Sequence, residues 1–249
     1  MENMNPSERV YHDLKELALL LFSPQCFDTY FVDKNFLDKP CFLATLSTVL
    51  GVGIVLGSIF VKLPQVLKIY NAKTAKGISL ATVTLDQIVL TLYSTYNYLK
   101  EFPMSAWADT AFLSIQTLAI AFLLLYYDGS PSKAYIYLVT YFIISGILES
   151  GLVPIDIIWA LQGINIPLLL IGRVIQVHAN YKNQSTGQLS AITCALLFFG
   201  SLARIFTSVQ DTGDTMVILT NVASFLANLV IIIQILYYWK SEEKVKKQD

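Results

Sequence analysis

The sequence predicts an all-α integral membrane protein in which seven transmembrane helices form two parallel three-helix repeats joined by a connector helix. Three observations support this prediction. Of the 249 residues, 55% are hydrophobic and 14% are charged, whereas charged residues make up about 25% of an ordinary soluble domain. Seven apolar stretches approach the ~20 residues with which a helix crosses a bilayer. Finally, segments of the chain repeat at a fixed distance.

The repeat is clearest in two segments that each follow an apolar stretch. Residues 62–80 read KLPQVLKIYNAKTAKGISL, and residues 173–191 read RVIQVHANYKNQSTGQLSA. A shift of 111 positions (173 against 62) aligns them without a gap. The same shift carries the LYY at 236–238 onto the LYY at 125–127. An offset that holds over several helix-length stretches indicates an internal duplication. The matched pairs are Lys62 with Arg173, Gln65 with Gln176, Val66 with Val177, Tyr70 with Tyr181 and Ser79 with Ser190.

In chain order we expect an N-terminal segment (1–41), a first repeat (42–127), a connector (128–154), a second repeat (155–239) and a charged tail (240–249). Apolar residues at helical spacing predict an amphipathic surface helix at 7–22. Because one connector helix separates the three-helix units, both have the same orientation, a plan that transporters use. The predicted spans are 42–61, 78–98, 107–127, 134–148, 155–175, 189–207 and 216–239.

The distribution of Lys and Arg predicts the orientation, because cytosolic loops carry the excess of basic residues. Both basic turns, the loop at 128–133 and the tail carry eleven of the 17 Lys and Arg residues. The C-terminus is therefore expected in the cytosol and the N-terminus in the lumen or outside. Cys26 and Cys41 then lie on the lumenal side, where a disulfide persists. A bridge between them and two unrelated thiols are both compatible with the sequence.

Pro64 and Gln65 lie at the predicted cytosolic end of the first span. Proline has no amide hydrogen and clashes with the preceding turn, so it bends or ends a helix. A transport hinge and a helix end with a polar cap are both open. The second repeat has Ile175 and Gln176 at this place, and its proline, Pro167, lies deeper in the fifth span. Any hinging should therefore differ between the halves.

Gly53 and Gly57 lie four residues apart in the first span. Small residues at this spacing let another helix approach closely. We expect a helix contact there, with a groove for a ligand chain as the alternative.

Asp86, with Gln87 beside it, lies inside the second span. A carboxylate at a helix centre costs about 2.5–3.5 kcal/mol on insertion scales, and such residues usually face a cavity or a partner. A proton- or substrate-coupled role and a static hydrogen bond to another helix are both open.

Further polar residues lie in the fifth and sixth spans. Arg204 offers bidentate donors to a phosphate, or it reaches the membrane surface by snorkelling. Trp159, Gln162 and Asn165 are spaced to share one helix face, which predicts that they line a central cavity. The sequence has no nucleophile–base set, phosphate-binding glycine loop or metal-ligand spacing. We therefore expect neither an enzyme nor a metal or cofactor site.

The segment KLPQVLKIYNAKTAKGISL resembles the PQ-loop motif, here Pro64 and Gln65 with Gln176 in the second copy. The paired three-helix arrangement resembles the PQ-loop and SWEET membrane families. TGQLSAIT (186–193) and GSLARIFTSVQDTGD (200–214) resemble the mannose-P-dolichol utilization defect family, as do the chain length, the paired cysteines and the short basic tail.

This resemblance implies residence in the endoplasmic reticulum. It also implies a requirement for the protein when dolichyl-phosphate mannose and dolichyl-phosphate glucose serve as donors in N-glycan precursor and GPI-anchor assembly. Flipping, chaperoning and presenting the lipid-linked sugar are all open. The expected partners are membrane lipids, these lipid-linked sugars and glycosyltransferases of the endoplasmic reticulum, but no nucleic acid. Lys246 and Lys247 resemble a dilysine retrieval signal, which must face the cytosol.

A phosphosugar moved through hydrocarbon would be desolvated and unpaired, which is costly. We therefore expect a polar seam between the repeats, lined by Asp86, Gln87, Gln162, Asn165 and Arg204. Lys62 and Arg173 would receive the phosphate at the cytosolic end. The alternative function is a small-solute transporter of the SWEET or cystine-exporter type, with Asp86 in proton coupling.

Overall fold

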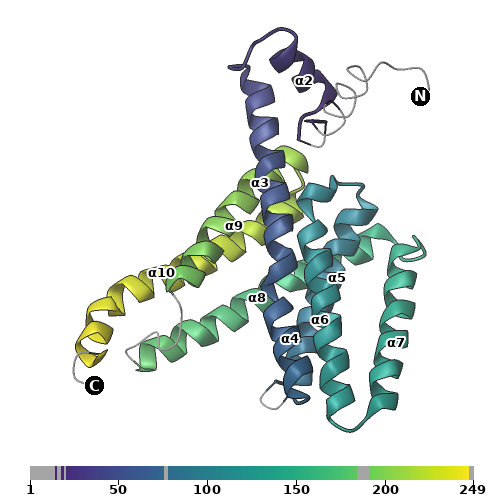
Figure 1. Ribbon diagram of the computed structural model, residues 1–249, viewed down its shortest axis with the longest axis vertical. Coiled ribbons are helices and arrows are strands. Elements are labelled where there is room, and N and C mark those ends of the chain that lie inside the picture. Colours follow the sequence, from purple (N-terminus) through teal and green to yellow (C-terminus); the bar gives the residue numbers. More distant parts are fainter. Residues whose placement is uncertain (1–14, 16–17, 20, 76–77, 184–190, 247–249) are drawn as a thin grey trace.

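The computed structural model describes residues 15, 18–19, 21–75, 78–183 and 191–246. Over these residues the fold consists of helices and connecting turns (Figure 1). Most of the expected amphipathic helix at 7–22 lies outside the described residues. The elements are α2 (Pro24–Phe31), α3 (Lys39–Val61), α4 (Leu63–Ala72), α5 (Leu80–Leu99), the 3₁₀ turn η1 (Met104–Ala106), α6 (Ala108–Tyr127), α7 (Pro131–Glu149), α8 (Ile155–Asn183), α9 (Ala191–Asp211) and α10 (Thr215–Lys246).

Each of the seven predicted spans falls on a helix, although α8 and α10 extend beyond the predicted ends at 175 and 239. Among the described residues, five helices are long and apolar enough to cross a membrane. These five are α3 together with α4, α6, α7, α8 and α10. The remaining two, α5 and α9, have 20 and 21 residues. Their length suffices, and in α5 the many polar side chains lower the hydropathy. Several of these side chains are buried against other helices, so α5 and α9 use polar groups for packing.

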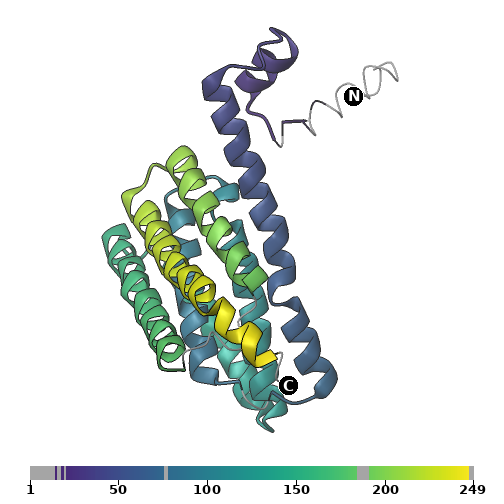
Figure 2. The ribbon, with the colours of Figure 1, turned by 90° about the vertical axis from the view of Figure 1, so that its left-hand side faces the viewer.

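The two repeats have the same internal packing. In the first repeat α6 packs against both α3 and α5, and in the second α10 packs against both α8 and α9. The 111-residue shift relates α3 to α8, α5 to α9 and α6 to α10, so the third helix of each unit lies between the other two. Figure 2 shows α10 between α8 and α9, with α3 on the far side of α9. The duplication seen in the sequence therefore extends to the tertiary structure.

Contacts between the repeats obey the same relation. Helix α3 packs against α9, and α5 packs against α8. The 111-residue shift relates α3 to α8 and α5 to α9, so the contact of α3 with α9 corresponds to the contact of α8 with α5. A pseudo-twofold axis between the repeats produces this correspondence. The connector helix α7 packs mainly on α6 and to a lesser extent on α5, so it belongs to the first repeat and has no counterpart in the second.

The halves differ where the sequence predicts that they should. In the first repeat the helix stops at Val61 and resumes as α4, with Pro64 in the first turn of the new helix. Proline suits this place because its missing amide hydrogen is not needed there. Helix α8 runs without interruption from Ile155 to Asn183 and contains Pro167.

The N-terminal part forms a small unit above α3 (Figure 1). Ser23 caps α2, with the Cys26 amide 3.3 Å from its hydroxyl oxygen, and Asp38 caps α3. A disulfide joins Cys26 to Cys41, and both cysteines pack with Tyr30. The bridge therefore ties α2 to the first turn of α3.

Candidate functional site

A polar cavity of about 450 Å³ opens at the α4 end of the first repeat. Four elements meet there because α6 packs against α3, α4 and α5. Its principal polar residues are Lys62 between α3 and α4, Gln65 on α4, Asp86 on α5 and Thr117 on α6. Ile78, Ser79, Thr82, Val83 and Ile120 complete the wall. A cavity with both charges and hydroxyl groups suits a polar ligand.

Lys62 and Asp86 are the charged residues of this cavity, and they form an ion pair. The ammonium group of Lys62 also donates to the hydroxyl of Thr117 at 2.7 Å. The Lys62 side chain is 20% exposed and that of Asp86 is 51% exposed. Solvent screens the pair from the side of Asp86, which is half-exposed. A ligand can therefore compete with Asp86 for the Lys62 ammonium group.

The helix break beside the cavity is held by Gln116 of α6, which the sequence analysis did not single out. The backbone amide of Lys62 donates to Gln116 Oε1 at 2.9 Å, and Gln116 Nε2 donates to the carbonyl of Ser58 at 2.9 Å. In an uninterrupted helix the Lys62 amide would bond to the Ser58 carbonyl itself. The glutamine amide is thus inserted into one backbone hydrogen bond and positions Lys62 at the cavity. The adjacent polar pair Gln116–Thr117 within an apolar span was the available signal.

The opposite end of the bundle is closed by Arg204 of α9. Its Nη1 donates to the carbonyls of Ser105 and Ala106 at 2.9 and 3.3 Å. Its Nη2 pairs with Asp109 of α6 at 2.6 Å. These partners belong to the first repeat, so the buried guanidinium of Arg204 clamps the two repeats together. In this structure protein groups occupy the guanidinium, and a contact of Arg204 with a phosphate stays a prediction.

Asp211 and Asp214, which follow Arg204 in the chain, make further contacts with the first repeat at this end. Asp211 accepts hydrogen bonds from Ser47 of α3 at 2.6 Å and from Ser105 at 3.3 Å. Asp214 accepts from the hydroxyl of Tyr96 of α5 at 2.9 Å and also caps α10. The DTGD turn between α9 and α10 is therefore held by the first repeat. We name the contacts of Arg204, Asp211 and Asp214 the η1-end clamp.

Gln162 and Asn165 lie between these two ends, where α8 packs on α5. Asn165 Nδ2 donates to Gln162 Oε1 at 2.7 Å and lies 3.3 Å from the carbonyl of Val89. Gln162 Nε2 and Asn165 Oδ1 are buried without a hydrogen-bond partner among the described residues. These two polar atoms mark the middle of the interface between the repeats.

The structure does not bring the five seam residues into one cavity. Asp86 lines the α4-end cavity, whereas Gln87 is turned toward α6, where its Nε2 lies 2.6 Å from Ser114 Oγ. Adjacent residues of a helix point about 100° apart, which explains their separation. The predicted shared face on α8 is also wrong for Trp159, which is 50% exposed while Gln162 is 0% exposed.

The remaining predicted residues lie elsewhere. Arg173 is half-buried on α8 and does not line the α4-end cavity. Gln176 belongs to α8, Lys246 is the last residue of α10, and Lys247 is outside the described residues. At Gly53 and Gly57 an added Cβ would meet nothing within 4 Å, so the expected helix contact is absent there among the described residues. Gly51 makes the close approach instead, with a Cβ placed 3.0 Å from Ser105 Cβ.

Comparison with known proteins agrees with this duplicated fold. A family model described as "PQ loop repeat" matches residues 46–106 and 157–217. Each matched position of the second segment lies 111 residues after its counterpart (157 against 46, 217 against 106), which confirms the offset. The chain is also 23% identical over 193 residues to human "Solute carrier family 66 member 3", covering 74% of this chain and 90% of that protein. With two PQ-loop repeats, helices able to cross a bilayer and this relative, the chain is a membrane protein of the PQ-loop repeat family.

Proposed function

We propose that this protein binds the phosphosugar headgroup of dolichyl-phosphate mannose and dolichyl-phosphate glucose in the α4-end cavity. By binding them, it would allow these lipids to act as sugar donors in the lumen during N-glycan precursor and GPI-anchor assembly. The observation that carries this proposal is the placement of Lys62, a cation at an open cavity that also offers hydroxyl groups. The ammonium group suits the phosphate, and Gln65, Thr82 and Thr117 suit the hydroxyls of a sugar.

The two ends of the bundle support a transport-like role. The η1-end clamp ties the repeats together with partly buried polar contacts. At the other end α4 packs on α6 and α3, while the C-terminal parts of α8 and α10 diverge from α4 (Figure 1). The cavity itself lies at this end, between Lys62, Gln65 and Asp86, so a headgroup would enter it there. Opening the clamp would let it reach the other side without crossing hydrocarbon unpaired.

The proposal includes the seven-span topology and the location. All seven helices would cross the membrane of the endoplasmic reticulum, with the N-terminus in the lumen and the tail in the cytosol. The repeat relation supports spanning roles for α5 and α9, because each is packed into its unit by the same neighbours as its counterpart. The Cys26–Cys41 bridge suits an oxidising compartment, and the basic residues favour a cytosolic α4 end. Glycosyltransferases are proposed partners for presenting the donor.

The test is binding of a water-soluble, short-chain prenyl-phosphate mannose to purified protein in detergent. Lys62→Gln should weaken binding about tenfold or more, because a charge-assisted hydrogen bond is lost. Lys68→Gln is the matched control, since Lys68 is exposed on α4 and outside the cavity. Equal binding by wild type and Lys62→Gln would remove the assigned site. Absence of binding by wild type would remove the proposed function.

A second candidate is a small-solute transporter. The accessible Lys62–Asp86 ion pair and the relative named as a solute carrier favour it. A substrate with both a carboxylate and an amine would pair with the two charges at once. Saturable, proton-dependent uptake of such a solute into proteoliposomes would support this candidate over the lipid-linked sugar.

A further inference from the structure

A groove between α5 and α7 lies outside the α4-end cavity and has no role in the function described so far. Its volume is about 250 Å³. It exists because α7 packs mainly on α6 and touches α5 less. The lining residues are Thr84, Gln87, Ile88, Thr91, Leu92, Tyr137, Thr140, Tyr141, Ile144, Ser145 and Leu148.

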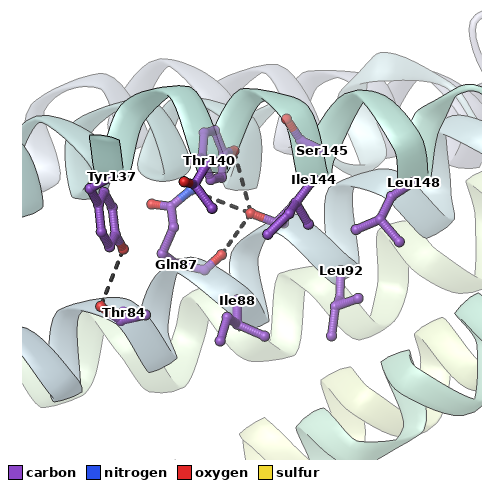
Figure 3. A pocket seen from close by; sticks show the side chains of 11 residues that line it. Thr84, Gln87, Ile88, Leu92, Tyr137, Thr140, Ile144, Ser145 and Leu148 are labelled. Carbon is purple, nitrogen blue, oxygen red and sulfur yellow. Dashed lines mark hydrogen bonds between the residues drawn. The ribbon is translucent and has the colours of Figure 1, made fainter. Parts of the chain in front are cut away.

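The groove surface is almost wholly apolar, although many of its residues are polar. The reason is that their polar atoms bond to one another. Tyr137 donates to the hydroxyl of Thr84 at 3.2 Å, as Figure 3 shows. The hydroxyls of Ser114 and Tyr141 lie 3.0 Å apart, and Thr91 donates to the carbonyl of Gln87 at 2.7 Å. Methyl groups and ring faces are left to line the groove, and these suit hydrocarbon.

The polarity of the residues that line the groove decreases from one end to the other. Thr84, Gln87 and Tyr137 lie at one end, and Leu92 and Leu148 lie at the other (Figure 3). Gln87 is buried, and its Oε1 has no partner among the described residues. A donor such as a water or a ligand hydroxyl would satisfy this oxygen. This grading fits an amphipathic molecule whose polar part lies toward Thr84.

The polar end of the groove lies at the level of the α4-end cavity. Asp86 lines the cavity and Gln87 lines the groove, although the two residues are adjacent on α5. The two sites therefore flank one helix. We propose that the groove holds the hydrocarbon tail of the same lipid whose headgroup lies at Lys62, an inference that rests on the proposed function.

The size of the groove fits a part of one chain. Pockets that enclose a drug-sized ligand measure about 300–1,000 Å³, so this groove takes the first segment of a tail and leaves the rest in the bilayer. Burial of each methylene stabilises the complex, so affinity should rise with chain length until the groove is filled. A small polar solute would gain nothing from it.

The experiment compares a long-chain polyprenyl-phosphate mannose with the short-chain analogue on the same purified protein. Wild type should bind the long chain about tenfold or more tightly. Ile144→Trp, which fills the groove from α7, should abolish this preference by weakening long-chain binding, while binding of mannose 1-phosphate, which has no chain to place in the groove, stays unchanged. Phe142→Trp is the matched control, because Phe142 is an exposed residue of α7 that lines a different hollow, against α6.

The outcomes separate this inference from the proposed function. Equal binding of both chains by wild type, or a chain preference that survives Ile144→Trp, overturns the groove assignment and leaves the headgroup site intact. Failure of both analogues to bind removes the proposed function and this inference with it.

A photoreactive polyprenyl phosphate supplies a second readout that does not depend on the variant folding well. Labelling should fall on peptides of α5 and α7. A photoreactive straight-chain phosphatidic acid that labels the same peptides equally well would overturn the assignment, because the groove would then hold ordinary membrane lipid.

Discussion

Gln116 of α6 accepts a hydrogen bond from the backbone amide of Lys62, 2.9 Å away, at the break between α3 and α4. Its Nε2 reaches the carbonyl of Ser58 on the other side of the break. One side chain thus holds the interrupted helix and places the Lys62 ammonium group at the cavity. The break between α3 and α4 is therefore part of the candidate site, because the side chain that holds it also positions Lys62.

Gln116→Leu should lower the unfolding free energy by about 1–3 kcal/mol, because it leaves the Lys62 amide and the Ser58 carbonyl without their partner. It should also weaken headgroup binding by displacing Lys62. Thermal unfolding in detergent and the short-chain binding assay measure the two effects. Gln210→Leu serves as control at an exposed position of α9. Equal melting temperatures for the two variants would show that the inserted amide does not hold the break.

Arg204→Met should be strongly destabilising, by about 3–5 kcal/mol, because it leaves Asp109 as an unpaired charge that is largely buried. Adding Asp109→Leu should recover part of this loss, since the uncompensated carboxylate is then gone. A double-mutant cycle on thermal unfolding measures the coupling. Additive effects of the two substitutions would mean that the ion pair does not couple the repeats.

Gly51→Val should disrupt the contact between α3 and η1, because a Cβ at this position would lie 3.1 Å from the Ser105 carbonyl oxygen. We expect a loss of about 1–3 kcal/mol from overpacking. Gly57→Val is the matched control in the same helix, where a Cβ meets nothing within 4 Å. The same melting temperature for both variants would contradict a close approach at Gly51.

Asp86→Asn distinguishes the two candidate functions by the sign of its effect. Asparagine keeps the shape of Asp86 but removes the negative charge that competes with a phosphate for Lys62. Binding of short-chain prenyl-phosphate mannose should therefore strengthen by several-fold. A proton-coupled solute transporter would instead lose its proton-dependent uptake. Weaker phosphomannose binding in this variant would count against the headgroup assignment.

The helices, the duplication and the helix end near Pro64 could be predicted from the sequence, because each depends on residues that are close together in the chain. Composition and helix-length apolar runs predict a helical membrane protein because lipid offers no partner for an unpaired backbone. The duplication was visible in KLPQVLKIY and RVIQVHANY, and the PQ-loop repeat matches confirm its offset. Pro64 predicted the end of a helix because proline acts on its own turn, and α3 does stop three residues before it.

The prediction of seven spans was only partly supported, and α5 shows one reason. Its hydropathy is lowered by polar residues such as Gln87, which is buried in the structure. Hydropathy treats a polar side chain as one that faces lipid or water. It does not register that a neighbouring helix satisfies that side chain. The hydrogen bond from Gln87 to Ser114 of α6 supplies this information.

Which polar residues meet was decided by the tertiary structure. Asp86 and Gln87 are adjacent in the sequence, but the 100° turn per residue sends one to Lys62 and the other to Ser114. Arg204 finds Asp109 only because α9 reaches the start of α6, 95 residues earlier in the chain (204 against 109). The sequence alone determined helices, repeats and the break at Pro64, since these depend on neighbouring residues. The packing of the helices determined the cavity and the clamp, because their partners come from segments that the chain itself keeps far apart.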